Sequence, residues 1–255
     1  MIRDLHAVLE GCADAIEEAL VDLETWTAPG SRRTQFECDV VADRVATEFL
    51  VAHGVGVFSE ESLPTHLNRD VVVVLDPVDG TQNALRGLSP FGPSLCAVVR
   101  GRPTAAHVRN LATGERFDAE AGEGATRDGS RACPAPQRPL DRALVGVSGP
   151  APPSLAAQGR AMGAVAFSLC AVATGALDAF VDFDFDHHRC WDHLAGALVC
   201  KEAGALVQDA SGRDLADLCE GRSPVAASHQ QLLDELLQRR AEHLGAQSAP
   251  HDLGT

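Results

Sequence analysis

The sequence comprises 255 residues, of which 45% are hydrophobic and 22% charged, the composition of a folded chain with a sizeable core. Its 36 acidic residues against 21 basic ones give a net charge of −15, which repels nucleic acid and anionic membranes and argues against both as partners. No apolar run approaches the roughly 18 residues of a transmembrane helix, and the acidic N-terminal segment is unlike a signal peptide, so we expect a cytoplasmic protein. The eight cysteines lack Cys-x-x-Cys spacing and are expected to be buried, reduced thiols.

The first half of the chain is predicted to hold two helices followed by a sheet. Apolar residues recur at spacings of three and four over 3–24 and again over 39–52, as in amphipathic helices. The uninterrupted apolar run 71–75 predicts a strand buried on both faces, because a half-exposed strand would alternate. Further strands are expected at 55–58, 93–99, 104–109 and 115–120, with a short helix at 81–85 and a loop at 121–139.

The second half alternates between strands and helices. Strands are expected at 143–148, 178–183, 205–209 and 224–228, and helices at 154–162, 166–174, 192–203 and 229–243. Strands and helices that interleave in blocks are typical of a layered α/β (α+β) fold. We expect one domain over residues 1–244, with sub-regions of about 1–140 and 141–244, and a flexible tail at 245–255.

Carboxylates gather where the predicted strands end. Glu60 and Glu61 follow the first short strand, Asp76 and Asp79 follow the second, and Asp192 opens a later helix. A sheet holds its strand ends side by side, so these groups can converge on one site. Neighbouring carboxylates repel one another unless a cation joins them, and oxygen ligands favour Mg²⁺, Ca²⁺ or Mn²⁺.

The segment Asp76-Pro77-Val78-Asp79-Gly80-Thr81 carries the strongest signal. Two aspartates three residues apart can face the same pair of metal ions. Gly80 lets the backbone approach a ligand closely, and the N–H groups at the start of the helix that follows can bind an anion such as phosphate. The alternative for this segment alone is an ordinary strand-to-helix turn with a capping aspartate.

Residues 75–87 (LDPVDGTQNALRG) resemble the signature of the inositol monophosphatase family. Three further segments resemble family motifs in the family's order, namely 58–62 (FSEES), 191–196 (WDHLAG) and 201–205 (KEAGA), and 112–129 looks like its central hairpin. The resemblance implies a layered α/β/α/β/α sandwich, a homodimer, and a Mg²⁺-dependent phosphatase that lithium inhibits.

The resemblance also implies a set of metal ligands. Glu60, Asp76 and the carbonyl of Val78 would bind the first Mg²⁺. Asp76, Asp79 and Asp192 would bind the second, so that Asp76 bridges both ions. Glu60 would hold a third, weaker ion through water, giving two or three ions per site.

The same resemblance implies roles in catalysis. Thr81 would orient the attacking water, and the amides of Gly80 and Thr81 would hold the phosphate. Residues 37–44 resemble the family stretch that supplies an acid to pair with this threonine. The match selects Asp39 as the water-activating residue, with Asp43 as the alternative, and either could instead be a helix-capping acid.

Substrate choice is less well defined by the motifs. Family resemblance places Gly163 and Ala164 in a small-residue turn at the substrate, and Asp182 as an acid before the second signature. The ligands Asp79 and Asp192 are also expected to contact the substrate. We expect a small phosphorylated substrate, a cyclitol or sugar-type monophosphate. The alternatives are histidinol phosphate, fructose 1,6-bisphosphate, or a phosphatase-like binding protein without catalysis.

The connection before Trp191 departs from the family in being longer and more acidic. Asp182, Asp184 and Asp186 alternate with Phe183 and Phe185, so an extended chain would present acids on one face and aromatic rings on the other. The acids could meet substrate hydroxyls or an amine. The alternative is a solvated acidic loop with both phenylalanines anchored in the core.

Two other candidates are weaker. Adjacent His187 and His188 lack the usual spacing of zinc ligands and are expected to form a loop or the edge of a pocket. Ser148 lacks the Gly-x-Ser-x-Gly spacing of a nucleophile elbow and is expected to be structural.

Overall fold

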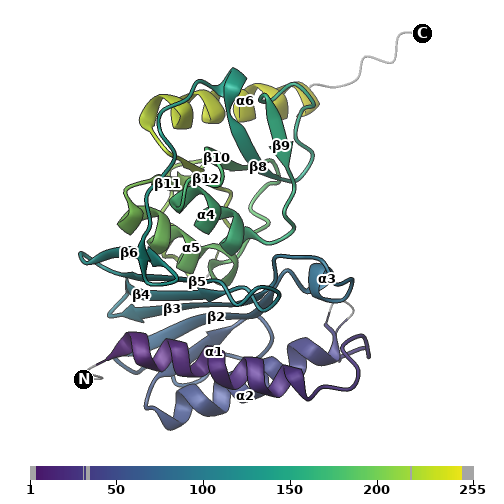
Figure 1. The fold of residues 1–255 in the computed structure, drawn as a ribbon, viewed down its shortest axis with the longest axis vertical. Coiled ribbons are helices and arrows are strands. Elements are labelled where there is room, and N and C mark those ends of the chain that lie inside the picture. Colours follow the sequence, from purple (N-terminus) through teal and green to yellow (C-terminus); the bar gives the residue numbers. More distant parts are fainter. Residues whose placement is uncertain (1–3, 31, 33–34, 219, 249–255) are drawn as a thin grey trace.

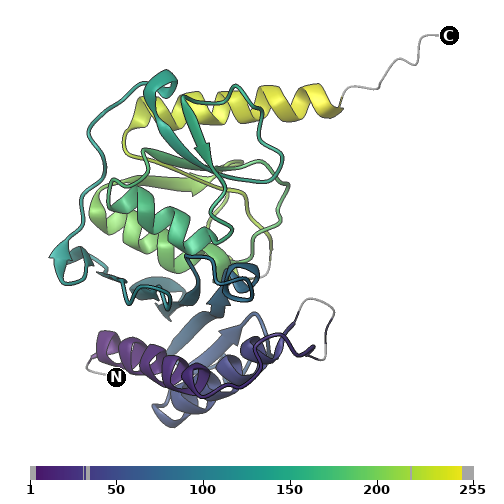
Figure 2. The same cartoon turned by 45° about the vertical axis from the view of Figure 1, so that its right-hand side comes forward.

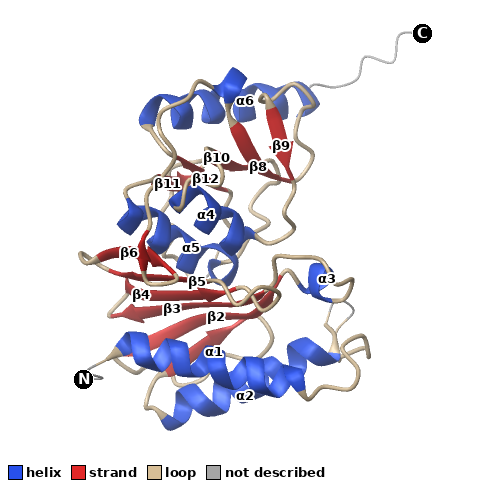
Figure 3. Cartoon of the chain, in the orientation of Figure 1, coloured by secondary structure: helices blue, strands red, loops and turns tan. Residues whose placement is uncertain are grey.

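The described residues of the computed structural model form five layers that follow one another along the long axis of the molecule (Figure 1). These residues are 4–30, 32, 35–218 and 220–248. The layers are a helix pair, a sheet, a second helix pair, a second sheet and a final helix, so helices and strands alternate through the molecule (Figure 3). This is the layered α/β sandwich that the sequence predicts.

The first two layers are built from the N-terminal half of the chain. The helices are α1 (Leu5–Val21) and α2 (Glu37–Ala52). In the described part of the chain, the first sheet has seven strands, arranged in sequence order: β1 (Gly56–Ser59), β2 (Val71–Asp79), β3 (Gly92–Val99), β4 (Arg102–Arg109), β5 (Arg116–Glu120), β6 (Gly124–Arg127) and β7 (Ser130–Arg131). Only the β1–β2 pair is parallel, and the remaining pairs are antiparallel.

The remaining layers come from the C-terminal half. The helix pair is α4 (Val165–Ala173) and α5 (Cys190–Ala203), and α6 (Gln230–Ser248) covers the far side of the second sheet (Figure 2). Counted over the described residues, that sheet has five strands in the order β11 (Leu206–Asp209), β12 (Pro224–Ala227), β10 (Ala179–Asp182), β8 (Leu144–Ser148) and β9 (Gln158–Arg160). The short helices α3 (Thr81–Ala84) and η1 (Leu140–Arg142) lie in connections.

Each interface between layers buries its own apolar cluster. Ile16 and Leu50 pack with Val73 between the first helix pair and the first sheet. Phe167 and Leu194 belong to the cluster between that sheet and the α4–α5 pair. A third cluster lies between the second sheet and α6. All nine residues of β2 are buried, which confirms the prediction from its continuous apolar run.

Strand β2 runs four residues further than the sequence predicts, and this extension matters for the site. Its pairing with β3 changes register between Asp76 and Asp79, where Asp76 pairs with Ser94 and Asp79 with Gly92. The irregularity follows from Pro77, which cannot donate a ladder hydrogen bond. The strand is therefore irregular between the two aspartates, and both lie in its last four residues.

Two secondary-structure predictions are wrong. Residues 154–162 form turns and the short strand β9 rather than a helix, in a segment that follows Pro152 and Pro153 and contains Gly159. Part of the expected loop 121–139 forms β6 and β7, which extend the first sheet through a tight turn at Asp128 and Gly129, both with positive φ. Asp-Gly between two short strands is a hairpin signal that the abundant Gly and Pro of this segment obscured.

Smaller differences concern the C-terminus and the cysteines. Helix α6 continues to Ser248, so the start of the expected tail is helical, and residues 249–255 lie outside the described part of the chain. Six of the described cysteines are buried and free, as expected, whereas Cys133 is free but exposed. Cys219 lies outside the described residues. The described helices include none with the length and apolarity to cross a membrane.

Candidate active site

The expected metal ligands come from three elements that meet at one end of the first sheet. Glu60 follows β1, Asp76 lies on β2, and Asp192 lies in the first turn of α5. One ligand atom from each of these three carboxylates lies within 4.8 Å of the other two. The sequence motifs, which are far apart along the chain, are therefore brought together in space.

One oxygen of each aspartate ligand is held by a backbone N–H group. The amide of Val78 donates to Asp76 Oδ1 at 2.9 Å, and the amide of Ala166 donates to Asp79 Oδ2 at 2.9 Å. The amide of Arg189 donates to Asp192 Oδ2 at 2.6 Å. Each carboxylate is thus fixed in orientation through one oxygen, and the second oxygen can serve a cation.

Burial and mutual repulsion make the ionised acids costly without a cation. Burial, with the charges of Asp192 and Glu61, raises the pKa of Glu60 to about 8. Burial and Asp192 raise the pKa of Asp79 to about 7, and burial, Glu60 and Asp79 raise that of Asp76 well above its ordinary value. A divalent cation removes this cost, and an all-carboxylate donor set fits Mg²⁺. The residues present therefore fit the metal that the sequence predicts.

Thr81 lies beside Asp39 and not beside Asp43. The Thr81 hydroxyl is 3.1 Å from Asp39 Oδ1 and 3.0 Å from the carbonyl oxygen of Val78, so it can donate to either. Burial raises the pKa of Asp39 to about 6, against hydrogen bonds from the Phe36 amide and Thr81 that lower it. The structure thus brings together the pair that the family motif selects.

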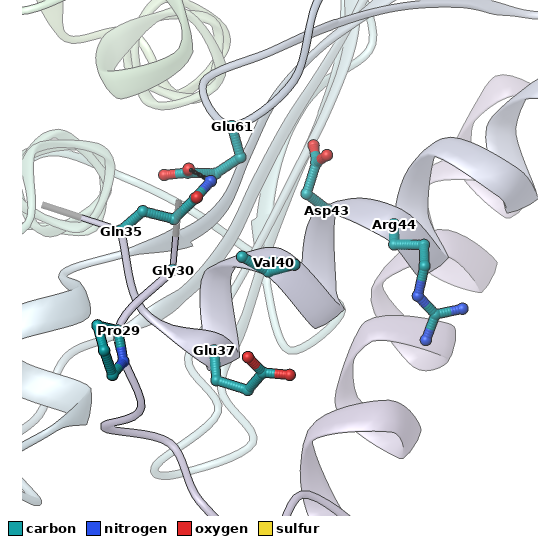
Figure 4. A pocket seen from close by; sticks show the side chains of 8 residues that line it. All are labelled: Pro29, Gly30, Gln35, Glu37, Val40, Asp43, Arg44 and Glu61. Carbon is teal, nitrogen blue, oxygen red and sulfur yellow. Dashed lines mark hydrogen bonds between the residues drawn. The ribbon is translucent and has the colours of Figure 1, made fainter. Parts of the chain in front are cut away.

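Asp43 has a different position. Its carboxylate accepts hydrogen bonds from Ser59 at 2.5 Å and Ser62 at 3.2 Å, which connect α2 to the end of β1. Asp43 also lines a cavity of about 450 Å³ beside α2 (Figure 4). The lining residues are Pro29, Gly30, Gln35, Glu37, Val40, Asp43, Arg44 and Glu61, and they include none of the expected metal ligands. The acid considered as the alternative base is therefore an anchoring residue.

Gly80 turns the chain from β2 into α3. Its φ is +86°, a conformation that L side chains rarely adopt, and a Cβ there would lie 2.9 Å from the Pro90 carbonyl oxygen. The expected small-residue turn packs against this segment, because a Cβ on Gly163 would lie 3.1 Å from Asn83 Oδ1. Gly163 is exposed and Ala164 is buried.

The expectation that Asp182 meets the substrate is wrong for its side chain, which is fully buried. Asp182 Oδ1 lies 3.5 Å from His188 Nε2. Phe183 is buried as expected, but Phe185 is 69% exposed, and Asp186 is paired with Arg213. Asp182 and Asp186 thus have side-chain partners within the protein, and of the two aromatic rings one is buried and one faces outward.

His188 is the site residue that the sequence motifs missed. Its Nε2 lies 3.1 Å from Ser148 Oγ, and its Nδ1 lies 3.8 Å from Asp192 Oδ2, the oxygen that the Arg189 amide also holds. Burial lowers the pKa of His188, but Asp182 and Asp192 outweigh that effect and raise it to about 10. The imidazole connects the ends of β8 and β10 to a metal ligand. The sequence signal for this role was the pair of consecutive histidines, which was expected to form a loop or the edge of a pocket.

The comparison with known families agrees with the geometry. The model of the inositol monophosphatase family matches residues 34–245. The chain belongs to the inositol monophosphatase family, which confirms the resemblance read from the motifs.

Relatives in this family carry several names. The fructose-1,6-bisphosphatase/inositol-1-monophosphatase of Methanothermobacter thermautotrophicus is 30% identical over 227 residues, which cover 78% of this chain and 81% of that protein. The fructose-1,6-bisphosphatase of Pyrococcus furiosus is 30% identical over 183 residues, 69% of this chain and 71% of that protein. The Nus factor SuhB of Escherichia coli is 31% identical over 160 residues, 57% of this chain and 59% of that protein.

Solved structures share the fold. A protein of Pyrococcus horikoshii with similarities to inositol-1-monophosphatase superposes with a TM-score of 0.85 at 23% identity, covering 94% of this chain and 99% of that one. The Thermotoga maritima IMPase gives a TM-score of 0.81 at 23% identity, covering 96% and 99%. At this level of identity the likeness establishes the layered fold alone.

Proposed function

We propose that the protein is a Mg²⁺-dependent phosphomonoesterase that hydrolyses a small cyclitol or sugar-type monophosphate. The observation that supports this most is the convergence of Glu60, Asp76 and Asp192, three buried or half-buried carboxylates from separate elements, beside a Thr81–Asp39 pair. Repelling carboxylates held in fixed orientation have a clear use as cation ligands.

In this proposal Glu60, Asp76 and the carbonyl of Val78 hold one Mg²⁺, and Asp76, Asp79 and Asp192 hold a second. Glu60 contributes to a third, weaker site. Bound Mg²⁺ supplies the positive charge that neutralises the phosphate oxygens and lowers the pKa of a water.

The protein's own groups then orient the reaction. The Thr81 hydroxyl donates to Asp39, so its oxygen lone pairs can accept a hydrogen bond from the attacking water. A pKa of about 6 leaves Asp39 mostly ionised at neutral pH and able to accept a proton through Thr81. The amides of Gly80 and Thr81 at the start of α3 hold the phosphate, and Gly80 keeps the approach free of a side chain.

The names of the relatives favour fructose 1,6-bisphosphate as the second candidate substrate. Histidinol phosphate remains a third possibility from the family, and a non-catalytic role is the alternative to all of them. We further propose a homodimer in the cytoplasm, as family members commonly form. Small-angle scattering tests the dimer, and a monomeric mass would refute it.

The test is a phosphate-release assay with and without Mg²⁺. The substrates are inositol 1-phosphate, fructose 1,6-bisphosphate, histidinol phosphate and a nucleoside monophosphate, with a generic aryl phosphate as reference. We expect Mg²⁺-dependent turnover of the cyclitol or sugar substrates above the reference. Absence of Mg²⁺-dependent turnover on every substrate, in a protein shown to be folded, would favour the non-catalytic alternative.

A further inference from the structure

A second group of potential metal ligands lies between α1 and the first sheet. His6 comes from α1, His107 from β4 and Asp118 from β5. His107 and Asp118 are directly opposed in the antiparallel β4–β5 ladder, so their side chains share one face of the sheet. One ligand atom from each residue lies within 4.8 Å of the other two, and none of the three belongs to the active site described above.

Both imidazoles converge on the same carboxylate oxygen. His6 Nε2 is 2.8 Å from Asp118 Oδ1, and His107 Nδ1 is 2.6 Å from it. The two rings are edge to face, with centroids 6.1 Å apart, so they direct a nitrogen each toward the carboxylate without stacking.

Burial makes His107 unusual. It is fully buried, and among the described residues its Nε2 has no hydrogen-bond partner. A buried imidazole costs free energy that an apolar residue in the same position would avoid. The nitrogen available to an ion is Nδ1, which faces Asp118, and not the unpartnered Nε2. His6, by contrast, has a side chain that is 38% exposed and provides access from solvent.

The neighbouring polar contacts between α1 and the sheet are of another kind. Arg109 on β4 pairs with Asp14 and Glu17 of α1, and Arg116 on β5 pairs with Glu10. In these contacts a permanent cation on the sheet meets an acid on the helix. At His6 the helix instead provides an imidazole, which can be neutral and bind a metal. The sheet provides a carboxylate and a second imidazole.

We propose that His6, His107 and Asp118 form a binding site for a transition-metal dication of the Zn²⁺ type. Two imidazole nitrogens and one carboxylate oxygen are a donor set that Zn²⁺ prefers and that Mg²⁺ does not, with water completing a tetrahedron. At Zn–ligand distances of about 2.0–2.1 Å the ligand atoms of a tetrahedral site are roughly 3.3 Å apart. The present separations of 2.6 and 2.8 Å thus need to open by about 0.7 and 0.5 Å.

Metal binding replaces the two imidazole–Asp118 hydrogen bonds by bonds from the same atoms to the ion. In each neutral imidazole, the proton on the nitrogen that faces Asp118 moves to the other ring nitrogen by exchange with water, so no net proton is released. Both free lone pairs and the carboxylate then face the ion. The ion would join the N-terminal turn of α1 to two strands of the sheet, so it should stabilise the fold.

The experiment is a titration of the full chain with Co²⁺, a spectroscopic substitute for Zn²⁺, in excess Mg²⁺ that occupies the all-carboxylate site. The variants are His6→Gln and Asp118→Asn, and the matched control is His53→Gln, which changes an exposed histidine at the end of α2. We expect wild type and His53→Gln to show the visible absorption of tetrahedral Co²⁺. Added Zn²⁺ should displace the bound Co²⁺ and abolish this absorption. Each ligand variant should bind at least about 10-fold more weakly.

Thermal unfolding supplies the second measurement. Zn²⁺ should raise the Tm of the wild type and of His53→Gln in the presence of Mg²⁺, but not that of His6→Gln. His6 is partly exposed, so this variant is expected to fold even if Asp118→Asn does not. Equal Co²⁺ affinity of wild type and His6→Gln, or no tetrahedral absorption in the wild type, would overturn the proposal and leave a purely hydrogen-bonded cluster. Neither measurement depends on phosphatase activity.

Discussion

Asp76→Asn should have opposite effects on metal-dependent activity and on the stability of the Mg²⁺-free protein. Asp76→Asn removes the carboxylate proposed to bridge two ions, so Mg²⁺-dependent phosphate release should fall more than about 100-fold. The same change removes a buried ionisable group whose raised pKa reflects the cost of ionising it in the fold, so at neutral pH the Mg²⁺-free variant should have a higher Tm than the wild type. Asp70→Asn, at an exposed aspartate, is the control. Retention of a tenth of the activity would refute the bridging role.

Thr81 should affect turnover and leave metal affinity intact. Thr81→Ala removes the hydroxyl between Asp39 and the proposed water, and kcat should fall roughly 100-fold. The Mg²⁺ concentration for half-maximal activity should stay the same, because the hydroxyl holds water rather than metal. Thr81→Ser should recover most of the loss. A large change in Mg²⁺ dependence would show that the hydroxyl belongs to the metal site.

His188 should act through Asp192. His188→Ala removes the imidazole beside Asp192 and leaves the Arg189 amide contact in place, so binding of the second ion should weaken roughly 10- to 100-fold, as for other residues that orient a metal ligand. Mn²⁺ binding followed by electron paramagnetic resonance measures this directly. The neighbouring His187→Ala is the matched control, since His187 is exposed. Equal Mn²⁺ affinity in both variants would show that His188 only fills space.

At the scale of single elements, the turn from β2 to α3 should tolerate no side chain at Gly80. Gly80→Ala combines positive φ with a contact of 2.9 Å to the Pro90 carbonyl oxygen. Gly87 also has positive φ but has nothing within 4 Å of an added Cβ, so Gly87→Ala isolates the conformational cost. Urea unfolding should show a loss of about 1–2 kcal/mol for Gly87→Ala and roughly 2–4 kcal/mol for Gly80→Ala. Equal losses would mean that the turn relaxes around the methyl group.

The elements that carry the site were largely predictable from the sequence, because their signals are local. The apolar run of β2 predicted the buried strand, and the acid-rich turn after it pointed to the two aspartates that we propose as ligands. The bend at Pro77 that continues the strand to Asp79 was not predicted, because the proline and the following acids suggested an end rather than an irregularity. The helix predicted over residues 154–162 is absent because this segment instead forms the exposed strand β9, which pairs with β8.

Asp182 and His188 show the limit of this reasoning for the site. Alternation of acids and aromatic rings correctly marked an unusual segment, but it could not show which face the second sheet and α6 would cover. Arg240 of α6 donates to the carbonyl oxygen of Asp182 at 2.5 Å, a contact across 58 positions. Such long-range packing decides which side chains of the segment are buried, and it cannot be inferred from the local pattern of a single sequence. The roles of Asp39, Thr81 and the metal ligands remain predictions until the variants are measured.

At the scale of the whole molecule, Mg²⁺ should stabilise the protein more at higher pH. The folded Mg²⁺-free protein keeps Glu60 and Asp79 protonated up to about pH 8 and 7, whereas the unfolded chain releases these protons near the ordinary values of 4.5 and 3.8. The folded state thus binds more protons in this window, and its stability falls as the pH rises through it.

Bound Mg²⁺ removes this loss because it requires the ionised carboxylates. The difference in Tm with and without Mg²⁺ should therefore be small at pH 5 and grow toward pH 8, as measured by differential scanning calorimetry. Asp76→Asn should show almost no such growth. A Mg²⁺ effect that is constant from pH 5 to pH 8 would mean that these acids are already ionised in the Mg²⁺-free fold.

The division of the ligands between the two halves of the chain has a consequence for biosynthesis. Glu60, Asp76 and Asp79 come from the first sheet, whereas Asp192 comes from α5, which packs against that sheet from the second half. A nascent chain that has left the ribosome only as far as β7 would carry most of the acids without their last partner. In the proposed site the second ion would have its full set of ligands only after α5 has been made and has docked, so metal loading would be one of the last steps in maturation.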